Sequence, residues 1–508
     1  MQGSSDPNRV LLDAAVLCGH LVPAGSVYAF LAEHRERLFG DELFEDLFPS
    51  GRGRPSVPAD VVATVMVLQA LEGLSDRDAV GQLRTNIAWK VAAGLALDDV
   101  GFHPTVLTLW RNRLRASERP QRIFDAVRAV VAETGVLAGK TRRALDSTVL
   151  EDAVIRQDAI MQLVAQIRRV RRCVPAAKAL TLGAHDYDSD PGKPPCAWDD
   201  PAAIDAVVTA LVTDARVVLD ALAGEPLADQ QAEAVGLLAL VAGQDVEPGD
   251  GPGTWRIAPR TTPDRMVSVI DPDSRHVHKT VHNYRDGFKA HIAVEPDTGI
   301  VTACELTAGN VGDAQAAPGL ISHEAERLEI LADSGYGAGE FRAALAAADH
   351  VAHIKPGPLT RSIEGGFTID DFTIDFVART ATCPAGFTVA ITPKRNATFG
   401  HRCNGCVLRD RCTRAVAGKT LVLHEHHALL AAARQHATTH EFKDAYTQHR
   451  PMVERTIAWL VARGHRKVRF RGIARNRIGF AHRCAAVNLR RLLNLGLSHD
   501  GNRWIIAT

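Results

Sequence analysis

The sequence has few aromatic residues, no net charge and no long apolar run. Aromatic residues make up 5% of the 508 residues, and 59 Lys and Arg balance 59 Asp and Glu. A nucleic-acid-binding protein that is basic throughout is therefore excluded, whereas a local basic region is not. The longest apolar runs, such as Val61–Ala70 and Ala234–Ala242, are much shorter than the roughly 20 residues of a membrane span.

The first residues also lack the features of a secretion signal. Met1–Arg9 is polar and does not have the basic start and apolar stretch of a signal peptide. We therefore expect a cytoplasmic protein with no membrane partner. Cysteines in a reducing compartment do not form a disulfide framework, so a cysteine cluster needs another explanation.

Four of the nine cysteines lie close together in the sequence: Cys383, Cys403, Cys406 and Cys412. The two residues between Cys403 and Cys406 give the knuckle spacing of a tetrahedral zinc site, which Cys383 and Cys412 would complete. We predict a structural Zn²⁺ here, because four thiolates leave no open position for catalysis. Reduced cysteines in a loop are the alternative.

The N-terminal part of the chain, residues 1–140, predicts several short helices. Ser75–Asp78 has the pattern of a helix N-terminus. A later helix is predicted from apolar residues at helical spacing with arginines between them: Leu107, Trp110, Leu114, Arg111 and Arg113. This arrangement suits a helix-turn-helix type of DNA-binding domain. An ordinary helical bundle with solvated arginines explains the same pattern.

The remainder, residues 141–508, predicts an α/β domain with a mixed sheet and two insertions. Its expected strands and helix are 141–148, the hairpin of 288–294 and 300–307, the helix 314–328, and 329–333. The first insertion is alanine-rich and helical, at about 151–262. The second, at about 355–440, contains the cysteine cluster.

Two acids, Asp146 and Asp333, end short apolar segments that read as strands. Neighbouring strands bring such carboxylates within a few ångströms, where a divalent cation between them offsets their repulsion. A single strand-end acid is more often a turn residue or a helix cap. Four other acids near these segments are rivals that spacing does not exclude: Asp271, Asp273, Asp286 and Asp313.

The third acid, Glu454, is the only acid among twelve Lys and Arg between Arg450 and Arg491. Pro451 fits the first turn of a helix, and Glu454 then shares a face with Ala458 and Val461. A carboxylate on an apolar face is costly without a partner, which favours a metal ligand over a solvated side chain. Two Mg²⁺ ions held by three carboxylates would suit phosphodiester chemistry.

Basic side chains around these acids would hold DNA phosphates. The predicted DNA-binding residues are Arg111, Arg113, Arg450, Arg455, Arg463, Arg466, Lys467, Arg469 and Arg471. A group of histidines (His276, His278, His282 and His291) also lies among cations. We expect those histidines near phosphates or solvent, although a metal site is conceivable.

Several short motifs, in this order, resemble the DDE transposases of bacterial insertion sequences, in the branch with an N-terminal helical domain and a cysteine cluster. The motifs are Gly53–Pro55, Gly73–Arg77, Trp89, Phe102–His103, Leu145–Thr148, Gly287–His291, Gly309–Asp313, Ala332–Tyr336 and Arg450–Arg455. Each motif is weak by itself, but their order is specific. The resemblance covers most of the chain except about residues 155–260.

This resemblance implies an RNase H-like catalytic fold with Asp146, Asp333 and Glu454 as catalytic metal ligands. It also implies two Mg²⁺ ions, for which Mn²⁺ is expected to substitute, and action on terminal inverted repeats and target double-stranded DNA. A homodimer on DNA and a bacterial, nucleoid-associated location are further expectations. The alternatives are a DNA-binding protein that has lost catalysis and a nuclease of this fold that does not join strands.

Overall fold

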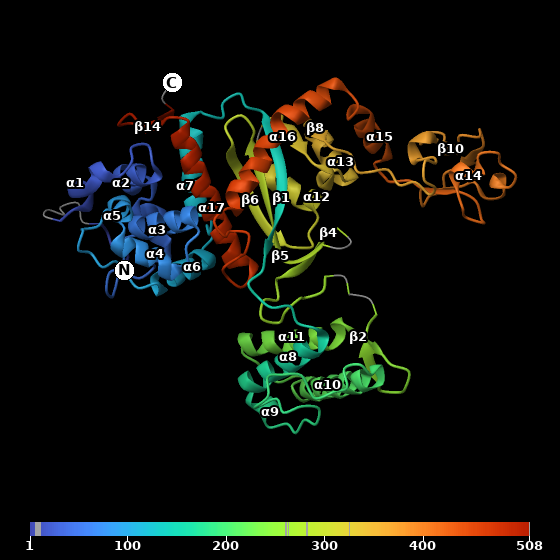
Figure 1. Cartoon of the computed structure of the whole chain (residues 1–508), viewed down its shortest axis with the longest axis horizontal. Coiled ribbons are helices and arrows are strands. Elements are labelled where there is room, and N and C mark those ends of the chain that lie inside the picture. The colour runs from blue at the N-terminus through green and yellow to red at the C-terminus, as the bar shows by residue number, and fades with distance from the viewer. Residues whose placement is uncertain (6–11, 260–261, 263, 281–282, 325, 507–508) are drawn as a thin grey trace.

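The structure is a computed structural model, and it describes residues 1–5, 12–259, 262, 264–280, 283–324 and 326–506. A twisted sheet lies at its centre, with the N-terminal helices beside it. Two segments project from this body in different directions (Figure 1). One is the helical insertion after the first strand, and the other is the cysteine-rich segment.

The central sheet has six strands. They are β1 (Arg142–Glu151), β4 (Arg275–Thr280), β5 (Asn283–Glu295), β6 (Ile300–Ala308), β7 (Glu329–Ala332) and β8 (Val351–Ile354). The main order is β4-β5-β1-β7-β8, and β6 also pairs with β5. β1 is antiparallel to β5 and parallel to β7, so the sheet is mixed as predicted. The predicted hairpin is confirmed, since β5 and β6 are antiparallel neighbours.

The prediction that the first strand ends at about residue 148 is wrong. β1 continues to Glu151, because β5 pairs with it as far as the Glu151–Gly287 pair. Asp146 therefore lies in the middle of a strand. Asp333, in contrast, directly follows the last residue of β7, as predicted.

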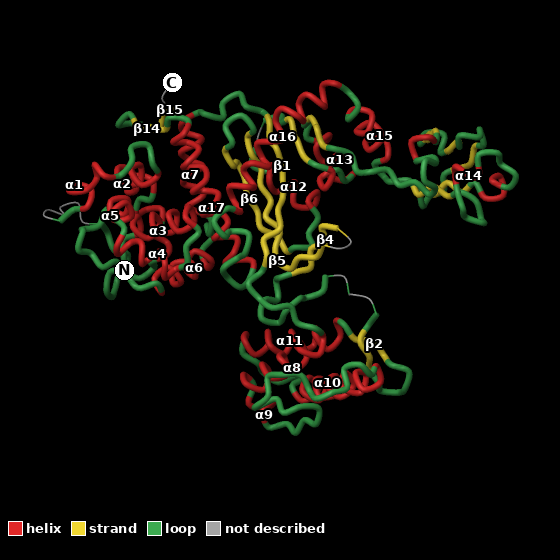
Figure 2. The backbone as a smooth tube through the Cα atoms, viewed as in Figure 1, coloured by secondary structure: helices red, strands yellow, loops and turns green. Residues whose placement is uncertain are grey.

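The sheet is covered by helices on both faces (Figures 1 and 2). The helices α16 (His440–Val461) and α17 (Ile473–Asn494) share a core with Ala144, Leu150 and Ile292. The helices α12 (Asp313–Ile321) and α13 (Gly339–Ala347) share a second hydrophobic core with Leu145 and Ala293. Because alternate residues of a strand face opposite sides, Asp146 lies on the α16 side and Ser147 on the α12 side.

The N-terminal helices pack against α17 and extend the core on that side of the sheet. They are α1 (Ala14–Cys18), α2 (Val27–Leu38), α3 (Ala59–Glu72), α4 (Asp76–Thr85), α5 (Ile87–Ala93), α6 (Thr105–Ala116) and α7 (Arg122–Thr134). The Ser75 side chain caps α4, and Leu107, Trp110 and Leu114 are buried on α6. Both local predictions are confirmed.

Each projecting segment has a small core of its own. The helical insertion comprises α8 (Ala159–Cys173), α9 (Pro175–Lys178), α10 (Pro201–Ala221), α11 (Asp229–Gln244), β2 (Val246–Pro248) and β3 (Trp255–Ile257). The cysteine-rich segment contains β9 (Thr373–Asp375), β10 (Thr380–Thr382), β11 (Thr388–Ala390), β12 (Asn396–Thr398), α14 (Arg409–Cys412) and β13 (Thr420–Val422). Loops make up much of that segment (Figure 2).

The helix that carries Glu454 differs from the prediction. Thr439 caps α16, so the helix begins at His440 and Pro451 lies in its interior rather than in its first turn. Its buried face includes Arg450, Val453 and Leu460, and Glu454 is exposed. Within the described residues, no helix is long and apolar enough to cross a membrane.

Candidate active site

Strand register brings Asp146 and Asp333 together. β1 pairs with β7 in parallel, with Ala144 opposite Leu331. Asp146 follows Ala144 by two residues, and Asp333 follows Leu331 by two residues. Asp333 is no longer in a strand; its side chain accepts a hydrogen bond of 2.9 Å from the Gly335 N–H and caps a short 3-10 helix. The carboxylate is thereby held at the end of β7, beside the centre of β1.

Arg450 lies between the two acids. One guanidinium nitrogen of Arg450 is 3.2 Å from Asp146 Oδ1 and 4.0 Å from Asp333 Oδ2. Burial alone lowers the pKa of Arg450, but Asp146 beside it raises that pKa above its ordinary value. Burial raises the pKa of Asp333, and the charges of Asp146 and Asp313 raise it further against the opposing effect of Arg450. The site therefore concentrates negative charge that one buried cation partly offsets.

A fourth acid, Asp313, approaches from the other face of the sheet. It is the first residue of α12, and its Oδ1 accepts a hydrogen bond of 2.8 Å from Ser147 Oγ. The Lys289 ammonium lies 3.3 Å from the same oxygen. A Cβ atom at Gly335 would lie 2.5 Å from Asp313 Oδ2 and 3.0 Å from Asp333 Oδ1. A glycine at this position therefore allows the two carboxylates to approach each other.

Glu454 lies on α16, about one helical turn after Arg450. It lines the same cavity of about 670 Å³ as the other acids. The polar side chains of that cavity come from β1, β5, α12 and α16, from the end of β7 and from the loop after α16: Asp146, Ser147, Thr148, Arg285, Lys289, Asp313, Asp333, Arg450, Glu454 and Arg466. Four carboxylates and four cations thus converge around one open space.

The rival acids lie in different places. Asp271 Oδ2 accepts a hydrogen bond from the Gly472 N–H, and Asp273 Oδ2 accepts one from the Ile473 N–H. These two carboxylates therefore bind backbone amides at the N-terminus of α17. Asp286 pairs with His276. Of the four rivals, Asp313 alone lines the cavity with Asp146, Asp333 and Glu454.

Lys289 is a site residue that the sequence reasoning did not select, and His291, which was expected near phosphates or solvent, is fully buried beside it. Both lie on the face of β5 that meets Ser147, and the His291 ring lies 3.7 Å from Asp313 Oδ1. Burial lowers the pKa of His291 to about 4, so the ring is neutral near pH 7. Their i, i+2 spacing on a strand was the available signal. His282 lies outside the described residues.

Part of the basic stretch between Arg450 and Arg491 is a loop. Residues 462–472 connect α16 to α17, and Arg466 donates a hydrogen bond of 2.7 Å to Thr148 Oγ1 at the edge of the site. The backbone of this loop pairs with β1, since the Val468 N–H donates to the Glu151 carbonyl. We call residues 462–472 the basic loop.

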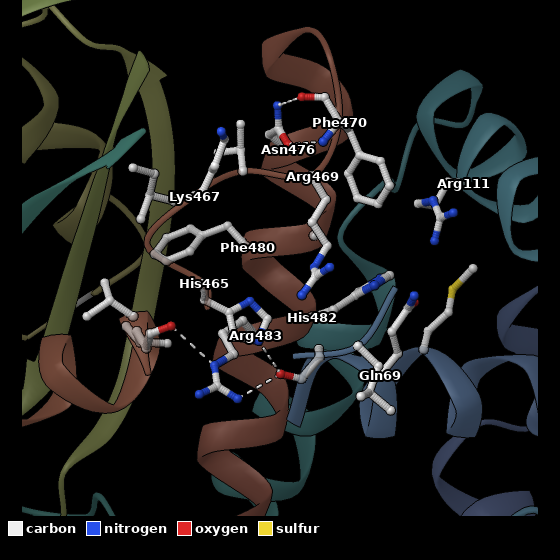
Figure 3. A pocket seen from close by; sticks show the side chains of 18 residues that line it. Gln69, Arg111, His465, Lys467, Arg469, Phe470, Asn476, Phe480, His482 and Arg483 are labelled. Carbon is white, nitrogen blue, oxygen red and sulfur yellow. Dashed lines mark hydrogen bonds between the residues drawn. The ribbon is translucent and has the colours of Figure 1, made fainter. Parts of the chain in front are cut away.

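The basic loop is also attached to the N-terminal helices (Figure 3). His465 Nε2 lies 2.8 Å from the Ala70 carbonyl oxygen, and Arg483 donates to the same oxygen at 2.7 Å. Arg469 donates to the Gly73 carbonyl. These carbonyls lie at the C-terminus of α3, the end of a helix that favours cations. The contacts line a cavity of about 80 Å³ and couple the N-terminal helices to the loop beside the site.

The predicted DNA-binding cations fall into two groups. Arg111 is buried against Asp76, with its guanidinium 4.5 Å above the Phe470 ring, and Arg450 is buried in the site. In this structure these two arginines contact other side chains of the protein and are not free to bind DNA phosphates. The exposed members are Arg113, Arg455, Arg463, Lys467, Arg469 and Arg471, and Arg466 is half-buried.

The four clustered cysteines line one cavity of about 20 Å³. All four are free thiols. Burial raises the pKa of Cys412, and the neighbouring Cys403, Cys383 and Cys406 raise it further. Thiols are the ligands that a thiophilic ion such as Zn²⁺ prefers, but these four are not gathered around one metal position among the described residues.

The described part of the chain contains no group of three or more His, Cys, Asp or Glu side chains already arranged around a metal position. The acids suit a divalent cation by their chemistry, because Asp146 and Asp333 share the Arg450 guanidinium, and Asp313 and Asp333 both lie within 3.0 Å of the position of a Cβ at Gly335. Binding would require the carboxylates, and Arg450 between them, to rearrange.

Two family models match the chain. Residues 17–113 match a transposase domain (DUF772), and residues 382–493 match a transposase DDE domain. The first match extends into α6 as far as Arg113, and the second includes Glu454 and the four clustered cysteines. No curated protein matches the chain, and no solved structure does.

These matches indicate a transposase, which is in general a DNA-cleaving enzyme. Together they support assignment of the chain to the insertion-sequence DDE transposases, as its motifs predict.

Proposed function

We propose that the chain binds the terminal inverted repeats of an insertion sequence and catalyses metal-dependent DNA strand cleavage and strand transfer. The observation that carries this proposal is the convergence of Asp146, Asp333 and Glu454 on one open cavity beside Arg450 and Arg466. The mixed sheet, in which β1 lies between antiparallel β5 and parallel β7, supports an RNase H-like catalytic fold. Residues 1–140 are proposed as its DNA-binding domain, which is followed by the catalytic domain of residues 141–508.

Mg²⁺ is proposed as the cofactor, with Asp146, Asp333 and Glu454 as its ligands. When bound, two Mg²⁺ ions supply activation of a water or a 3′-hydroxyl and stabilise the leaving oxygen. Asp313 is proposed as a positioning residue, since it holds Ser147 beside Asp146 and attracts Lys289. Arg466 and Lys289 would hold phosphates at the cavity. Transposition requires that two DNA ends be held together, so a homodimer on DNA is part of the proposal.

The proposal is tested with labelled duplex DNA that carries the two ends of the genomic element around the coding sequence. We expect specific binding, a nick or break at the ends in Mg²⁺ or Mn²⁺, and joined products with target DNA. Specific binding without cleavage would assign a DNA-binding protein that has lost catalysis. Cleavage without joining would assign a nuclease.

A structural Zn²⁺ held by Cys383, Cys403, Cys406 and Cys412 completes the proposal. We expect about one zinc per chain in the purified protein by elemental analysis, and substantial loss of zinc in Cys406→Ser. Removal of zinc by a chelator should expose the cysteine-rich segment to trypsin, because its core is small. Cys196→Ser is the matched control, since Cys196 lies in the helical insertion. Equal zinc content in both variants would contradict the assignment.

A further inference from the structure

The cysteine-rich module, which we define as residues 367–425, projects away from the sheet (Figure 1). It is joined to the body by the chain after β8 and by α15 (His427–His436). Its core is separate from the cores of the sheet, and consists of Phe372, Ala381, Ile391, Ala397, Phe399, Leu421 and Leu423. The outer surface of the module is therefore available to a partner.

The module is strongly basic in part of its sequence. Residues 379–419 contain eight Lys and Arg but one acid, Asp410. The cations are Arg379, Lys394, Arg395, Arg402, Arg409, Arg411, Arg414 and Lys419. Six of the eight are exposed; Arg409 and Lys419 are half-buried. Across residues 367–425 the eight cations are accompanied by five acids, of which only Asp410 lies within residues 379–419. The positive charge is therefore concentrated in one part of the module, and such a region attracts a polyanion.

Most of these cations are not neutralised by ion pairs within the module. The structure describes every residue of the module. Among them, Arg395 is the one cation of the eight that forms an ion pair, at 3.5 Å from Glu425. Arg402 and Arg409 donate to backbone carbonyls of the module, and Arg411 lies 4.8 Å from the Phe367 ring centre. Lys394 and Arg414 extend from exposed loops. The Thr368 backbone N–H lowers the pKa of Asp371, and the charges of Arg361 and Arg411 lower it further, so Arg411 is partly offset. Lys394, Arg402 and Arg414 form no ion pair among the described residues.

Apolar side chains lie beside the cations. Val407 is 93% exposed and Val416 is 92% exposed, and they flank Arg409, Arg411 and Arg414 in the sequence. Isolated exposed valines are common on protein surfaces. Here, next to cations, their methyl groups suit the deoxyribose and thymine methyl groups that accompany phosphates in duplex DNA.

We propose that the basic surface of the cysteine-rich module is a second DNA-binding surface, which contacts the phosphate backbone of duplex DNA without reading its sequence. This proposal rests on the proposed function only in taking DNA as the substrate. It requires no cleavage, no metal in the active site and no contact from the N-terminal helices. The module would add phosphate contacts outside the DNA held at the carboxylate cavity.

The test compares the DNA affinity of full-length variants over a series of salt concentrations, with a duplex of unrelated sequence as the probe. The triple variant Lys394→Gln, Arg402→Gln, Arg414→Gln removes three exposed cations. We expect the slope of log affinity against log salt to become shallower by about 2 to 3, because each phosphate contact contributes about 0.9. Affinity at about 100 mM salt should fall at least about tenfold.

Two controls separate charge from folding. The matched variant Arg156→Gln, Arg172→Gln, Lys178→Gln removes three exposed cations near or within the helical insertion and should leave the slope unchanged. The conservative variant Lys394→Arg, Arg402→Lys, Arg414→Lys keeps the charge and should bind as the wild type does. An Asp333→Asn chain tests the active site separately, since it should lose cleavage but keep the wild-type slope.

A triple Gln variant with the wild-type slope would overturn the proposal. A triple Gln variant that loses self-association in sedimentation, while its slope is unchanged, would also overturn it and would assign the surface to a second copy of the chain. Equal losses of DNA affinity in the Gln and conservative variants would show that side-chain shape, not charge, is responsible. That result would also overturn the proposal.

Discussion

The Asp333→Asn variant is expected to cleave DNA at least about a thousandfold more slowly than the wild type, equivalent to about 4 kcal/mol in the barrier. An amide cannot carry the negative charge with which a carboxylate binds Mg²⁺. The substitution preserves shape, and an Asn oxygen is still able to accept the hydrogen bond from the Gly335 N–H. The fold at the end of β7 should therefore persist while the metal site is lost.

Cleavage rate and DNA affinity are measured on the same preparations. DNA affinity should stay within about twofold of the wild type, because Asp333 is an acid and makes no attractive contact with a phosphate. Asp220→Asn is the control, since Asp220 is an exposed acid on α10 far from the site in sequence. Near-wild-type cleavage by Asp333→Asn would remove this acid from the proposed metal ligands.

The Arg450→Gln variant is expected to lose about 3 kcal/mol of stability in the absence of divalent metal. Arg450 is buried and offsets the charges of Asp146 and Asp333, and loss of one member of a buried ion pair leaves the others unpaired. The urea midpoint should fall. Mg²⁺ should restore more stability to this variant than it gives the wild type, since it would supply the missing positive charge.

Arg455→Gln is the matched control for this effect. Arg455 lies on the same helix but is exposed, so its replacement should change stability by less than about 0.5 kcal/mol. In the double variant Asp146→Asn, Arg450→Gln, part of the lost stability should return, because one unpaired carboxylate is removed. If Arg450→Gln unfolds at the wild-type midpoint without metal, the guanidinium does not hold the acids together.

The strands next to the site were predictable because their side-chain patterns are local. The hairpin of β5 and β6 alternates and contains a short turn, and the segment ending at Asp333 is apolar. The length of β1 was not predictable in this way, because it depends on pairing with β5, more than a hundred residues later. The start of α16 at His440 was missed because Pro451 gave a stronger local signal than the true cap, Thr439.

The site was predictable in its acids but not in the contacts among them. Spacing could not separate Asp313 from Asp271 and Asp273, because only the folded chain places Asp313 beside Ser147 and the other two at α17. Arg111 was assigned to DNA from its helical position, whereas its Asp76 partner is 35 residues earlier. Charge counts locate basic segments, but they do not show which cations form buried ion pairs within the protein and which remain exposed to DNA.

The most direct test of the central claim measures Mn²⁺ binding to the full-length chain by calorimetry, with zinc already in place. The account predicts saturable binding by the wild type and by Asp220→Asn, and an affinity at least about tenfold lower in Asp146→Asn, Asp333→Asn and Glu454→Gln. Equal Mn²⁺ affinity in the wild type and in these three variants would contradict the assignment of the carboxylate cavity as the catalytic metal site.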